Sequence, residues 1–330
     1  MEKIRWGILG CGKIANKFAA DLRLVKDAEL VAIASRNPKK IAAFTAEFPV
    51  PLVFHTYEAL AASPDVDVIY VATPHGFHRD HTLLCLQHKK AVLCEKAFAL
   101  NTYQVQDMIA AARKHNTFLM EAFWTKFLPQ YQKVSTLIKS GDIGEVKLVQ
   151  ADFGFRAEKP TPQRLYDPTL GGGALLDIGI YPVFLALSFL GKPVDVKAVM
   201  KPYSSGVDEQ IAMTLAFENG ALANLSATFA ADTPVEATIV GTAGYIRMSN
   251  RFHNATSHIT MVKDRQPPQT IEVHREEGYG YQFEARHVNS CLNKGLTESP
   301  VMCHADSLLL IETLDRIRKS CGIRYEADRQ

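Results

Sequence analysis

Short apolar runs alternate with amphipathic stretches along the first third of the chain. The apolar runs lie at residues 4–9, 29–34, 66–72, 91–94 and 118–120. Between them, helical spacing is found at about 14–25, from Pro38 onward, at 76–89 and at 102–113. Apolar runs separated by helices are typical of parallel strands that are covered on both faces. The pattern therefore predicts a parallel β-α-β layer over residues 1–122.

After Ala122 the pattern changes to an alternation of apolar and polar residues. Alternating segments lie at 146–155, 194–201, 209–218, 221–230, 235–241 and 257–263. Helical spacing returns at 127–140, 174–190, 280–294 and 304–320. Because turn signals such as Glu218-Asn219-Gly220 separate the alternating segments, we expect antiparallel pairing. Residues 123–330 are therefore predicted to form an α+β domain with a large, mostly antiparallel open sheet.

A glycine-rich turn lies between the first predicted strand and the first predicted helix. Its sequence, Gly10-Cys11-Gly12-Lys13-Ile14-Ala15, has the form G-x-G-x-x-A. In that context the pattern indicates an α/β Rossmann domain that binds a dinucleotide pyrophosphate. The expected cofactor contacts are Gly10, Gly12, Lys13, Ile14 and Ala15. A tight turn without a ligand is the alternative; a P-loop is disfavoured because Ile14 stands where a magnesium-binding hydroxyl is needed.

The residues after the second predicted strand distinguish between the two nicotinamide cofactors. NAD sites usually place an acidic residue there for the ribose 2′-hydroxyl. This chain has Ser35-Arg36 instead, with Lys39 and Lys40 close behind. Because an arginine can pair with a 2′-phosphate and stack on adenine, we expect NADP, held by Ser35, Arg36 and Lys40. A basic helix start that only faces solvent is the alternative interpretation.

Composition and charge narrow the class of protein. Of 330 residues, 37 are Lys or Arg and 35 are Asp or Glu, which gives a net charge of +2. This balance argues against a dedicated binder of nucleic acid or of a membrane surface. The six cysteines are scattered without a C-x-x-C pair, and no signal peptide is visible. The weakly polar stretch 178–191 is shorter than the ~20 residues of a membrane span, so we expect a cytoplasmic protein.

Two further segments carry side chains suited to proton transfer. Glu95-Lys96 follows the fourth apolar run, at the sheet edge where parallel sheets gather functional residues. Asp177 and Tyr181 lie four residues apart, on one face of a predicted helix that follows three glycines. A lysine ammonium lowers the pKa of a nearby tyrosine from about 10, so Lys96 and Tyr181 can act as a general acid/base pair. Taken singly, they also fit a surface lysine and a packed tyrosine.

Three histidines invite a metal interpretation that the spacing does not support. His75, His78 and His81 are each three residues apart, so on a helix their side chains would point in different directions rather than toward one point. The chain has no H-E-x-x-H motif and no cysteine pair to join them. We therefore expect no metal site.

These motifs together resemble the Gfo/Idh/MocA oxidoreductase family, and the resemblance covers essentially the whole chain. It rests on Gly10-x-Gly12-x-x-Ala15, Glu95-Lys96 and Gly171-Gly172-Gly173-x-x-x-Asp177-x-x-x-Tyr181. The segments 120–127 and 173–182 look like the branch that contains dimeric dihydrodiol dehydrogenases and NADP-dependent D-xylose dehydrogenases. Many other members, such as inositol dehydrogenases, carry histidine in place of Tyr181.

The resemblance implies a role for each candidate residue. Tyr181 would exchange the proton of a substrate hydroxyl, Lys96 would tune Tyr181, and Asp177 would orient the site. Further cofactor contacts would come from Thr73, Pro74, His75, His78, Glu95 and Lys96. Substrate contacts would come from Trp124, Phe127, Phe155, Arg164 and Tyr281, although the aromatic side chains equally fit a core. The resemblance also implies a homodimer formed through the open sheet.

The sequence thus predicts an NADP-dependent oxidoreductase. It would move a hydride between nicotinamide and a carbinol carbon of a trans-dihydrodiol, a polyol or an aldose such as D-xylose. A non-catalytic NADP-sensing regulator is one alternative, and it would not need both Lys96 and Tyr181. A redox-neutral lyase that retains its nicotinamide is another, and release of NADPH during turnover would distinguish the dehydrogenase from it.

Overall fold

The computed structural model describes residues 3–158 and 163–329, which form two compact units. The first unit comprises Met1–Phe127 and Glu276–Leu308, and the second comprises Leu128–Arg275 and Leu309–Gln330. This division differs from the expected contiguous domains 1–122 and 123–330, because a late segment of the chain belongs to the first unit.

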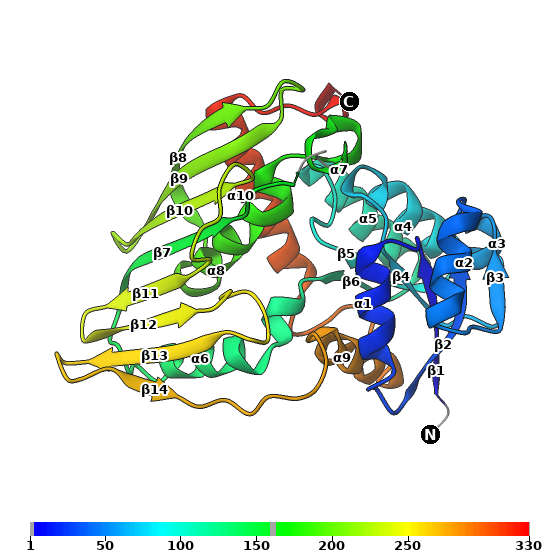
Figure 1. Cartoon of the computed structure of the whole chain (residues 1–330), viewed down its shortest axis with the longest axis horizontal. Helices are drawn as coiled ribbons and strands as arrows, with labels where there is room; N and C mark the ends of the chain where they lie inside the picture. The colour runs from blue at the N-terminus through cyan, green and yellow to red at the C-terminus, as the bar shows by residue number, and fades with distance from the viewer. Residues whose placement is uncertain (1–2, 159–162, 330) are drawn as a thin grey trace. The chain divides into compact units, whose positions relative to one another are not determined.

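A parallel six-stranded sheet forms the core of the first unit (Figure 1). Its strands are β1 (Ile4–Leu9), β2 (Ala28–Ala34), β3 (Leu52–Phe54), β4 (Val68–Val71), β5 (Ala91–Glu95) and β6 (Leu119–Ala122). They pair in the order β3-β2-β1-β4-β5-β6, and every pairing is parallel. The order reverses at β1, so the carboxyl ends of β1 and β4 flank the point where such sheets bind ligands. The expected Rossmann domain is confirmed.

Helices connect the strands of this unit. They are α1 (Lys13–Leu22), α2 (Pro38–Glu47), α3 (Tyr57–Ala62), α4 (His78–Gln87) and α5 (Thr102–His115), with 3-10 turns η1 (His75–Phe77) and η2 (Trp124–Phe127). The first two and the last two lie where the apolar spacing predicts them. The short pair β3 and α3 is not predicted, because three to six residues are too few for a periodic signal.

A buried aspartate attaches the late segment to the first unit. Asp21, near the end of α1, accepts hydrogen bonds from the backbone N–H groups of Tyr279, Gly280 and Tyr281 at 2.8–3.0 Å. These groups lie at and just before the start of α9 (Tyr281–Asn293), whose N-cap is Gly280, so Asp21 satisfies backbone N–H groups where that helix begins. The indole of Trp6 on β1 also donates to Asn289 Oδ1 at 3.0 Å. These contacts place α9 beside α1.

The second unit is built on an eight-stranded sheet (Figure 1). Its strands are β7 (Val146–Gly154), β8 (Pro193–Pro202), β9 (Asp208–Phe217), β10 (Leu222–Thr228), β11 (Ala237–Gly241), β12 (Gly244–Ser249), β13 (His258–Lys263) and β14 (Gln269–Ile271). They pair in the order β14-β13-β12-β11-β7-β10-β9-β8, and only the β10–β7 pairing is parallel among the residues described. The expected open, mostly antiparallel sheet is therefore confirmed.

Helices cover one face of this sheet. They are α6 (Pro129–Lys139), α8 (Ile180–Leu190) and the later part of α10 (His304–Cys321), and the opposite face bears no helix of the described chain (Figure 1). The strands alternate accordingly: on β9, Ile211, Met213 and Leu215 are buried, whereas Ala212 and Thr214 are exposed. One face of the sheet is thus a core and the other is open.

One helical segment of the second unit has the composition of a membrane span. Pro168–Leu190 is 23 residues long and reaches a mean hydropathy of 1.9. The run is longer than 178–191 because the 3-10 turn η3 (Pro168–Leu170) and the π-helical turn η4 (Leu175–Gly179) precede α8. Within the protein 83% of its most apolar window is buried, which is typical of a core helix.

Candidate functional site

The glycine loop joins β1 to α1 at the point where the strand order reverses. Gly10 has a φ of +102°, and a Cβ there would lie 3.0 Å from Thr73 Cγ2. Gly12 is the N-cap of α1, and no side chain of the described residues caps that helix. A Cβ at Gly12 would lie 4.0 Å from the carbonyl oxygen of Ala72. The first N–H groups of α1 are therefore open to an anion, as a dinucleotide pyrophosphate requires.

The residues around the loop fit the same ligand. Ala15 is fully buried, so α1 packs closely on the sheet, whereas Lys13 is exposed and Ile14 is half-buried. Burial raises the pKa of the Cys11 thiol to about 11, and the charge of Lys40 acts against that rise. Lys40 therefore places positive charge beside the loop, where it favours a phosphate.

A cationic side chain stands beyond the carboxyl end of β2. Ser35 is buried, and its hydroxyl accepts a hydrogen bond from the Asn37 N–H at 3.2 Å. Asn37 in turn caps the first turn of α2 through its side-chain oxygen. Arg36 projects into solvent, with its guanidinium carbon 5.2 Å from the centre of the Tyr57 ring. Arg36 therefore lies where the ribose of a dinucleotide is bound in Rossmann folds.

Two buried histidines follow β4. His78 Nδ1 lies 2.8 Å from the Ala97 carbonyl oxygen, and His78 Nε2 lies 2.7 Å from that of Thr73. Burial lowers the pKa of His78 to about 4, and the charge of Lys96 acts in the same direction. His75 packs edge-on against His78, with ring centres 5.6 Å apart. His78 thus connects the segment after β4 to the segment after β5.

Glu95 and Lys96 lie at the carboxyl end of β5, as expected. Glu95 is buried and accepts a hydrogen bond from the Tyr70 hydroxyl, and the Lys96 N–H donates to Glu95 Oε2 at 3.2 Å. On the neighbouring strand β6, burial raises the pKa of Glu121 to about 7, while the charge of Lys96 acts to lower it. Lys96 therefore lies close enough to both His78 and Glu121 to influence their ionisation.

In the second unit, the three glycines make room for the protein itself. A Cβ at Gly172 would lie 2.8 Å from the Leu165 carbonyl oxygen. Gly173 has a φ of +118°, and a Cβ there would lie 2.4 Å from Asp208 Oδ1. The other oxygen of Asp208 accepts the Leu175 N–H at 2.6 Å, where η4 begins. The glycines therefore let a buried carboxylate hold the start of the helix that carries Asp177 and Tyr181.

Asp177 and Tyr181 have different partners. Arg164 holds Asp177 through two hydrogen bonds, in which Nη1 donates to Oδ1 at 3.2 Å and Nη2 donates to Oδ2 at 3.0 Å. Tyr181 is buried, and its ring lies 5.7 Å from that of Phe153 and 4.8 Å from the imidazole of His253. The π-helical turn between the two residues is a feature often found at functional sites. Arg164, a predicted substrate contact, thus contacts Asp177 directly.

The predicted aromatic wall is divided between the two units. In the first unit Trp124 stacks on Tyr281, with ring centres 4.6 Å apart and planes at 6°. Phe127 instead packs on His287 at 4.9 Å. In the second unit Phe155 packs on Phe229 at 5.2 Å. Trp124 and Tyr281 are therefore brought together, whereas Phe127 and Phe155 each pack with a different partner.

The structure groups the predicted residues in two sets. In the first unit the glycine loop, Arg36, the segment 73–78 and Lys96 all follow the carboxyl ends of the sheet's strands. In the second unit Asp177 and Tyr181 lie on adjoining helical turns. No group of three or more His, Cys, Asp or Glu side chains suited to a metal occurs in 3–158 or 163–329.

Sequence patterns miss three residues of these surroundings. They are Tyr57 beside Arg36, Glu121 beside the charge of Lys96, and His253 beside Tyr181. Glu121 has a signal, because a carboxylate inside the apolar strand β6 is unusual. Tyr57 and His253 lie in short or irregular segments that have no periodic pattern.

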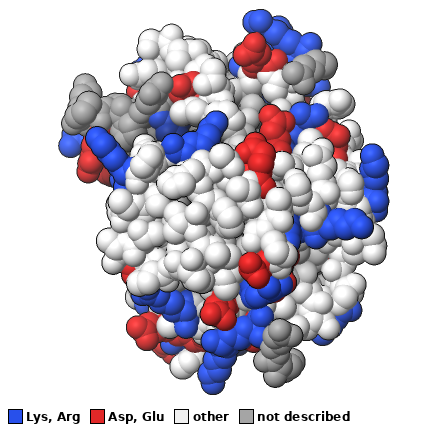
Figure 2. All heavy atoms as spheres, turned by 90° about the vertical axis from the view of Figure 1, so that its right-hand side faces the viewer, with Lys and Arg blue, Asp and Glu red and all other residues white. Residues whose placement is uncertain are grey.

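The charges on one face of the molecule are mixed. Figure 2 shows Lys and Arg interspersed with Asp and Glu around a broad uncharged area. On that face neither sign forms a continuous field of the kind that attracts a polyanion.

Comparison with known proteins agrees with this geometry. Residues 4–123 match the oxidoreductase family with an NAD-binding Rossmann fold, and residues 131–247 match the GFO/IDH/MocA C-terminal domain. The chain is 42% identical over 328 residues to a trans-1,2-dihydrobenzene-1,2-diol dehydrogenase from Xenopus tropicalis, covering 97% of this chain and 99% of that protein. The Homo sapiens protein of the same name is 33% identical over 334 residues, covering 99% of each chain.

Two solved structures are similar over nearly the whole chain. An aldose-aldose oxidoreductase from Caulobacter crescentus, complexed with glycerol, has a TM-score of 0.89 at 26% identity, covering 97% of this chain and 98% of that one. A 3-ketoreductase from Actinomadura kijaniata, in complex with NADP and TDP-benzene, has a TM-score of 0.86 at 28% identity, with the same coverage.

Proposed function

Because this chain belongs to the Gfo/Idh/MocA oxidoreductase family, we propose that it is an NADP-dependent dehydrogenase of a trans-dihydrodiol or an aldose. The observation that carries the proposal is the full-length similarity to proteins named trans-1,2-dihydrobenzene-1,2-diol dehydrogenase, in a chain that has both Lys96 and Tyr181. An aldose such as D-xylose is the second candidate substrate, because a similar structure is named an aldose-aldose oxidoreductase.

The preference for NADP is supported by the end of β2. Ser35 and Arg36 stand where NAD sites usually have a carboxylate. Arg36 is exposed, so its guanidinium is available to a 2′-phosphate, and Lys40 adds charge beside the glycine loop. One of the similar structures also contains NADP. Arg36 would supply the larger part of the discrimination, because its planar fork matches a phosphate.

The proton side of the reaction is assigned to Tyr181. When bound, the nicotinamide supplies the acceptor for the hydride that leaves the carbinol carbon. We assign to Tyr181 the uptake of the hydroxyl proton of the substrate, and to Lys96 the ammonium charge that a tyrosine phenolate needs in order to form near neutral pH. Asp177, which two hydrogen bonds from Arg164 hold in place, is assigned to orient the substrate beside Tyr181. Oxidation of a trans-dihydrodiol gives a ketone that tautomerises to a catechol.

Two features of the first unit assist this chemistry. His78 is held by two carbonyl oxygens and fixes the segment Thr73–His75, which would line the nicotinamide. The stacked pair Trp124 and Tyr281 would present an apolar surface to a ring and exclude water from the reacting carbon.

A reducing cytoplasm suits the six cysteines, all described and all free thiols.

A homodimer is proposed through the open face of the eight-stranded sheet. Ala216, Leu222, Leu148, Val240 and Tyr245 form one apolar row across five neighbouring strands of that face. Leu222 is 43% exposed and Tyr245 is 37% exposed. Because an apolar band of this width is unusual on a monomer, a second copy of the sheet is a fitting cover.

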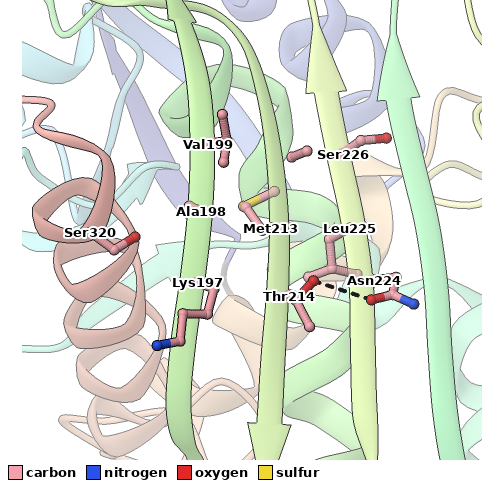
Figure 3. Close-up of a pocket in the computed structure, with 10 residues that line it drawn as sticks. Lys197, Ala198, Val199, Met213, Thr214, Asn224, Leu225, Ser226 and Ser320 are labelled. Atoms are coloured by element: carbon pink, nitrogen blue, oxygen red, sulfur yellow. Dashed lines mark hydrogen bonds between the residues drawn. The ribbon is translucent and has the colours of Figure 1, made fainter.

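The same face is hollowed near its edge. A cavity of about 570 Å³ opens there. Its walls include Lys197 and Val199 of β8, Thr214 of β9 and Asn224 of β10 (Figure 3). Thr214 donates to Asn224 at 3.3 Å, so polar groups satisfy one another beside an exposed valine. The hollow would receive side chains of the second copy.

The experiment that tests the function follows, with purified protein, the absorbance of the reduced cofactor, NADPH or NADH. NADP+ and NAD+ are each combined with trans-dihydrodiols, aldoses including D-xylose, and inositols. A signal with NADP+ and one class of diol or aldose supports the proposal and names the substrate. Binding of NADP+ without turnover on the whole panel contradicts it and favours a regulator, and substrate conversion without net NADPH favours a lyase.

A further inference from the structure

A tyrosine outside the glycine loop contacts Arg36, the arginine that we propose binds the 2′-phosphate of NADP. β2 and β3 are paired in parallel with Ala34 opposite Phe54, so the residues that follow them leave the sheet side by side. Arg36 comes two residues after β2, and Tyr57 comes three residues after β3. The Arg36 guanidinium carbon lies 5.2 Å from the centre of the Tyr57 ring, within the range of a cation–π contact.

Tyr57 is itself fixed from two sides. Thr56 caps α3 by accepting the Ala59 N–H at 3.2 Å, which sets the backbone at Tyr57. The ring of His81 on α4 meets the Tyr57 ring edge-on, with centres 4.6 Å apart. His81 Nδ1 in turn lies 2.9 Å from the Thr73 hydroxyl oxygen. Tyr57 is therefore a half-buried platform that β3 and α4 position together.

The charge state of His81 is compatible with a cation nearby. Burial lowers the pKa of His81 to about 4, and the charges of His78 and Arg36 act in the same direction. At neutral pH the ring is uncharged, so it supports Tyr57 without repelling the guanidinium. Arg36, Tyr57, His81 and Thr73 thus form one connected series of contacts.

We propose that Tyr57 is a positioning residue that holds the Arg36 guanidinium for the 2′-phosphate and so determines how strongly the protein prefers NADP over NAD. An exposed arginine loses rotamer freedom when it pairs with a ligand, and a side chain already held on a ring loses less. A ring contact uses the face of the guanidinium and leaves its N–H edge free to donate to phosphate. This inference rests on the proposed use of NADP.

The test measures dissociation constants of NADP+ and NAD+ by calorimetry, without turnover. Tyr57→Leu removes the ring, and we expect NADP+ to bind roughly threefold to fivefold more weakly, the usual worth of an exposed cation–π contact, with NAD+ unchanged. Tyr57→Phe keeps the ring face and should bind both cofactors as the wild type does. Tyr57→Met replaces Tyr57→Leu if circular dichroism shows that the latter does not fold.

A double-mutant cycle separates positioning from a general effect. If Tyr57 acts through Arg36, Tyr57→Leu should cost nothing further for NADP+ in an Arg36→Ala background. Tyr279→Leu is the matched control, because Lys17 lies 5.3 Å over that ring in a cation–π pair elsewhere in the same unit, and its NADP+ affinity should not change.

The outcomes separate this inference from the function on which it rests. Equal losses for both cofactors in Tyr57→Leu, an unchanged NADP+ affinity, or a full additional loss in the Arg36→Ala background would each overturn the role of Tyr57. If Arg36→Ala itself leaves the ratio of NADP+ to NAD+ affinity unchanged, the proposed cofactor preference fails first. A loss in Arg36→Ala with none in Tyr57→Leu leaves the function intact and rejects only the inference.

Discussion

The imidazole of His253 lies 4.8 Å from the ring of Tyr181 and stacks on Phe153 at 4.3 Å. The loop that carries His253 follows β12 through two consecutive left-handed residues, Asn250 and Arg251, with φ of 56° and 64°. Its next residue, Phe252, is fully buried and donates its N–H to the Val235 carbonyl at 3.1 Å. The loop is thus shaped to place an aromatic ring against the proposed acid/base residue.

Removing that ring should disturb Tyr181 without touching the cofactor loop. We expect His253→Ala to lower kcat about tenfold to a hundredfold, because a small displacement of a reacting group has a large effect on rate. His253→Phe keeps the packing and should retain most of kcat. Steady-state kinetics measure kcat of both variants, and their NADP+ affinity should equal that of the wild type. Identical losses of kcat in the two variants would show that ring packing is not the cause.

The hydroxyl of Tyr181 is the group on which turnover should depend. Tyr181→Phe keeps the ring contacts with Phe153 and His253 and removes only the oxygen that exchanges the proton. We expect kcat to fall about 10²- to 10⁴-fold, the usual worth of a general acid/base, with NADP+ affinity intact. Tyr166→Phe is the control, since that buried tyrosine packs on Tyr203 and is not assigned to the site. Undiminished turnover in Tyr181→Phe would reject the assignment.

The crowding at Gly173 predicts a large loss of stability. Gly173→Ala would combine a φ of +118° with a Cβ 2.4 Å from Asp208 Oδ1, and we expect about 2–5 kcal/mol of destabilisation. Gly141 has a φ of +77° and no atom of the described chain within 4 Å of its Cβ position. Gly141→Ala should therefore cost only about 1–2 kcal/mol. Urea unfolding of both variants measures the difference, and equal losses would argue against the contact with Asp208.

The buried carboxyl of Glu121 should make stability depend on pH. Burial raises its pKa from 4.5 to about 7, so between these values the folded chain binds a proton that the unfolded chain has lost. The contribution of Glu121 to stability is thus greatest below about pH 4.5 and is lost as the pH rises through 7.

A neutral substitute isolates this contribution. Glu121→Gln cannot ionise, so its free energy of unfolding relative to wild type should increase from pH 5 to pH 8, by up to about 3 kcal/mol. Urea unfolding of both proteins at the two pH values provides the measurement. A difference that stays constant over this range would mean that Glu121 is already ionised in the folded protein at pH 5.

A charge in the apolar row should separate the proposed dimer. Leu222→Glu places a carboxylate within the apolar row of the open face, and burying it against a second copy is unfavourable. We expect light scattering to give twice the monomer mass for wild type and the monomer mass for the variant. Tyr103→Glu, at a 57% exposed position on α5, should remain a dimer. A wild-type protein that is monomeric at micromolar concentration would reject the interface.

The sequence predicts those elements of the fold whose hydrophobic pattern is local and periodic. The apolar runs and the glycine turn predict β1, β2, β4, β5 and β6 and the dinucleotide loop. The strand β12 is missed because only Ile246 and Met248 of its six residues are buried, and β14 is an exposed edge of three residues. His253 follows one of these missed elements, so no pattern points to it.

Long-range contacts set the other limit. Asp21 and the N–H of Tyr281 are 260 positions apart. The periodicity of neither segment predicts the hydrogen bond between them. The expected boundary at residue 122 marks where the strand pattern changes, not where the packing of the first unit ends. The ion pair between Arg164 and Asp177 is likewise not predicted, because the sequence suggests Arg164 only as a contact for substrate.

The hydrogen bonds that Asp21 accepts at the start of α9 also have a consequence for synthesis of the chain. The dinucleotide-binding unit is made first, but the segment that satisfies Asp21 and the Trp6 indole emerges from the ribosome only after nearly all of the second unit. Until then a carboxylate and an indole N–H that are buried in the finished protein remain without their native partners. The first unit thus reaches its final form only near the end of translation, and a gene fragment that stops at the apparent domain boundary encodes an incomplete cofactor domain.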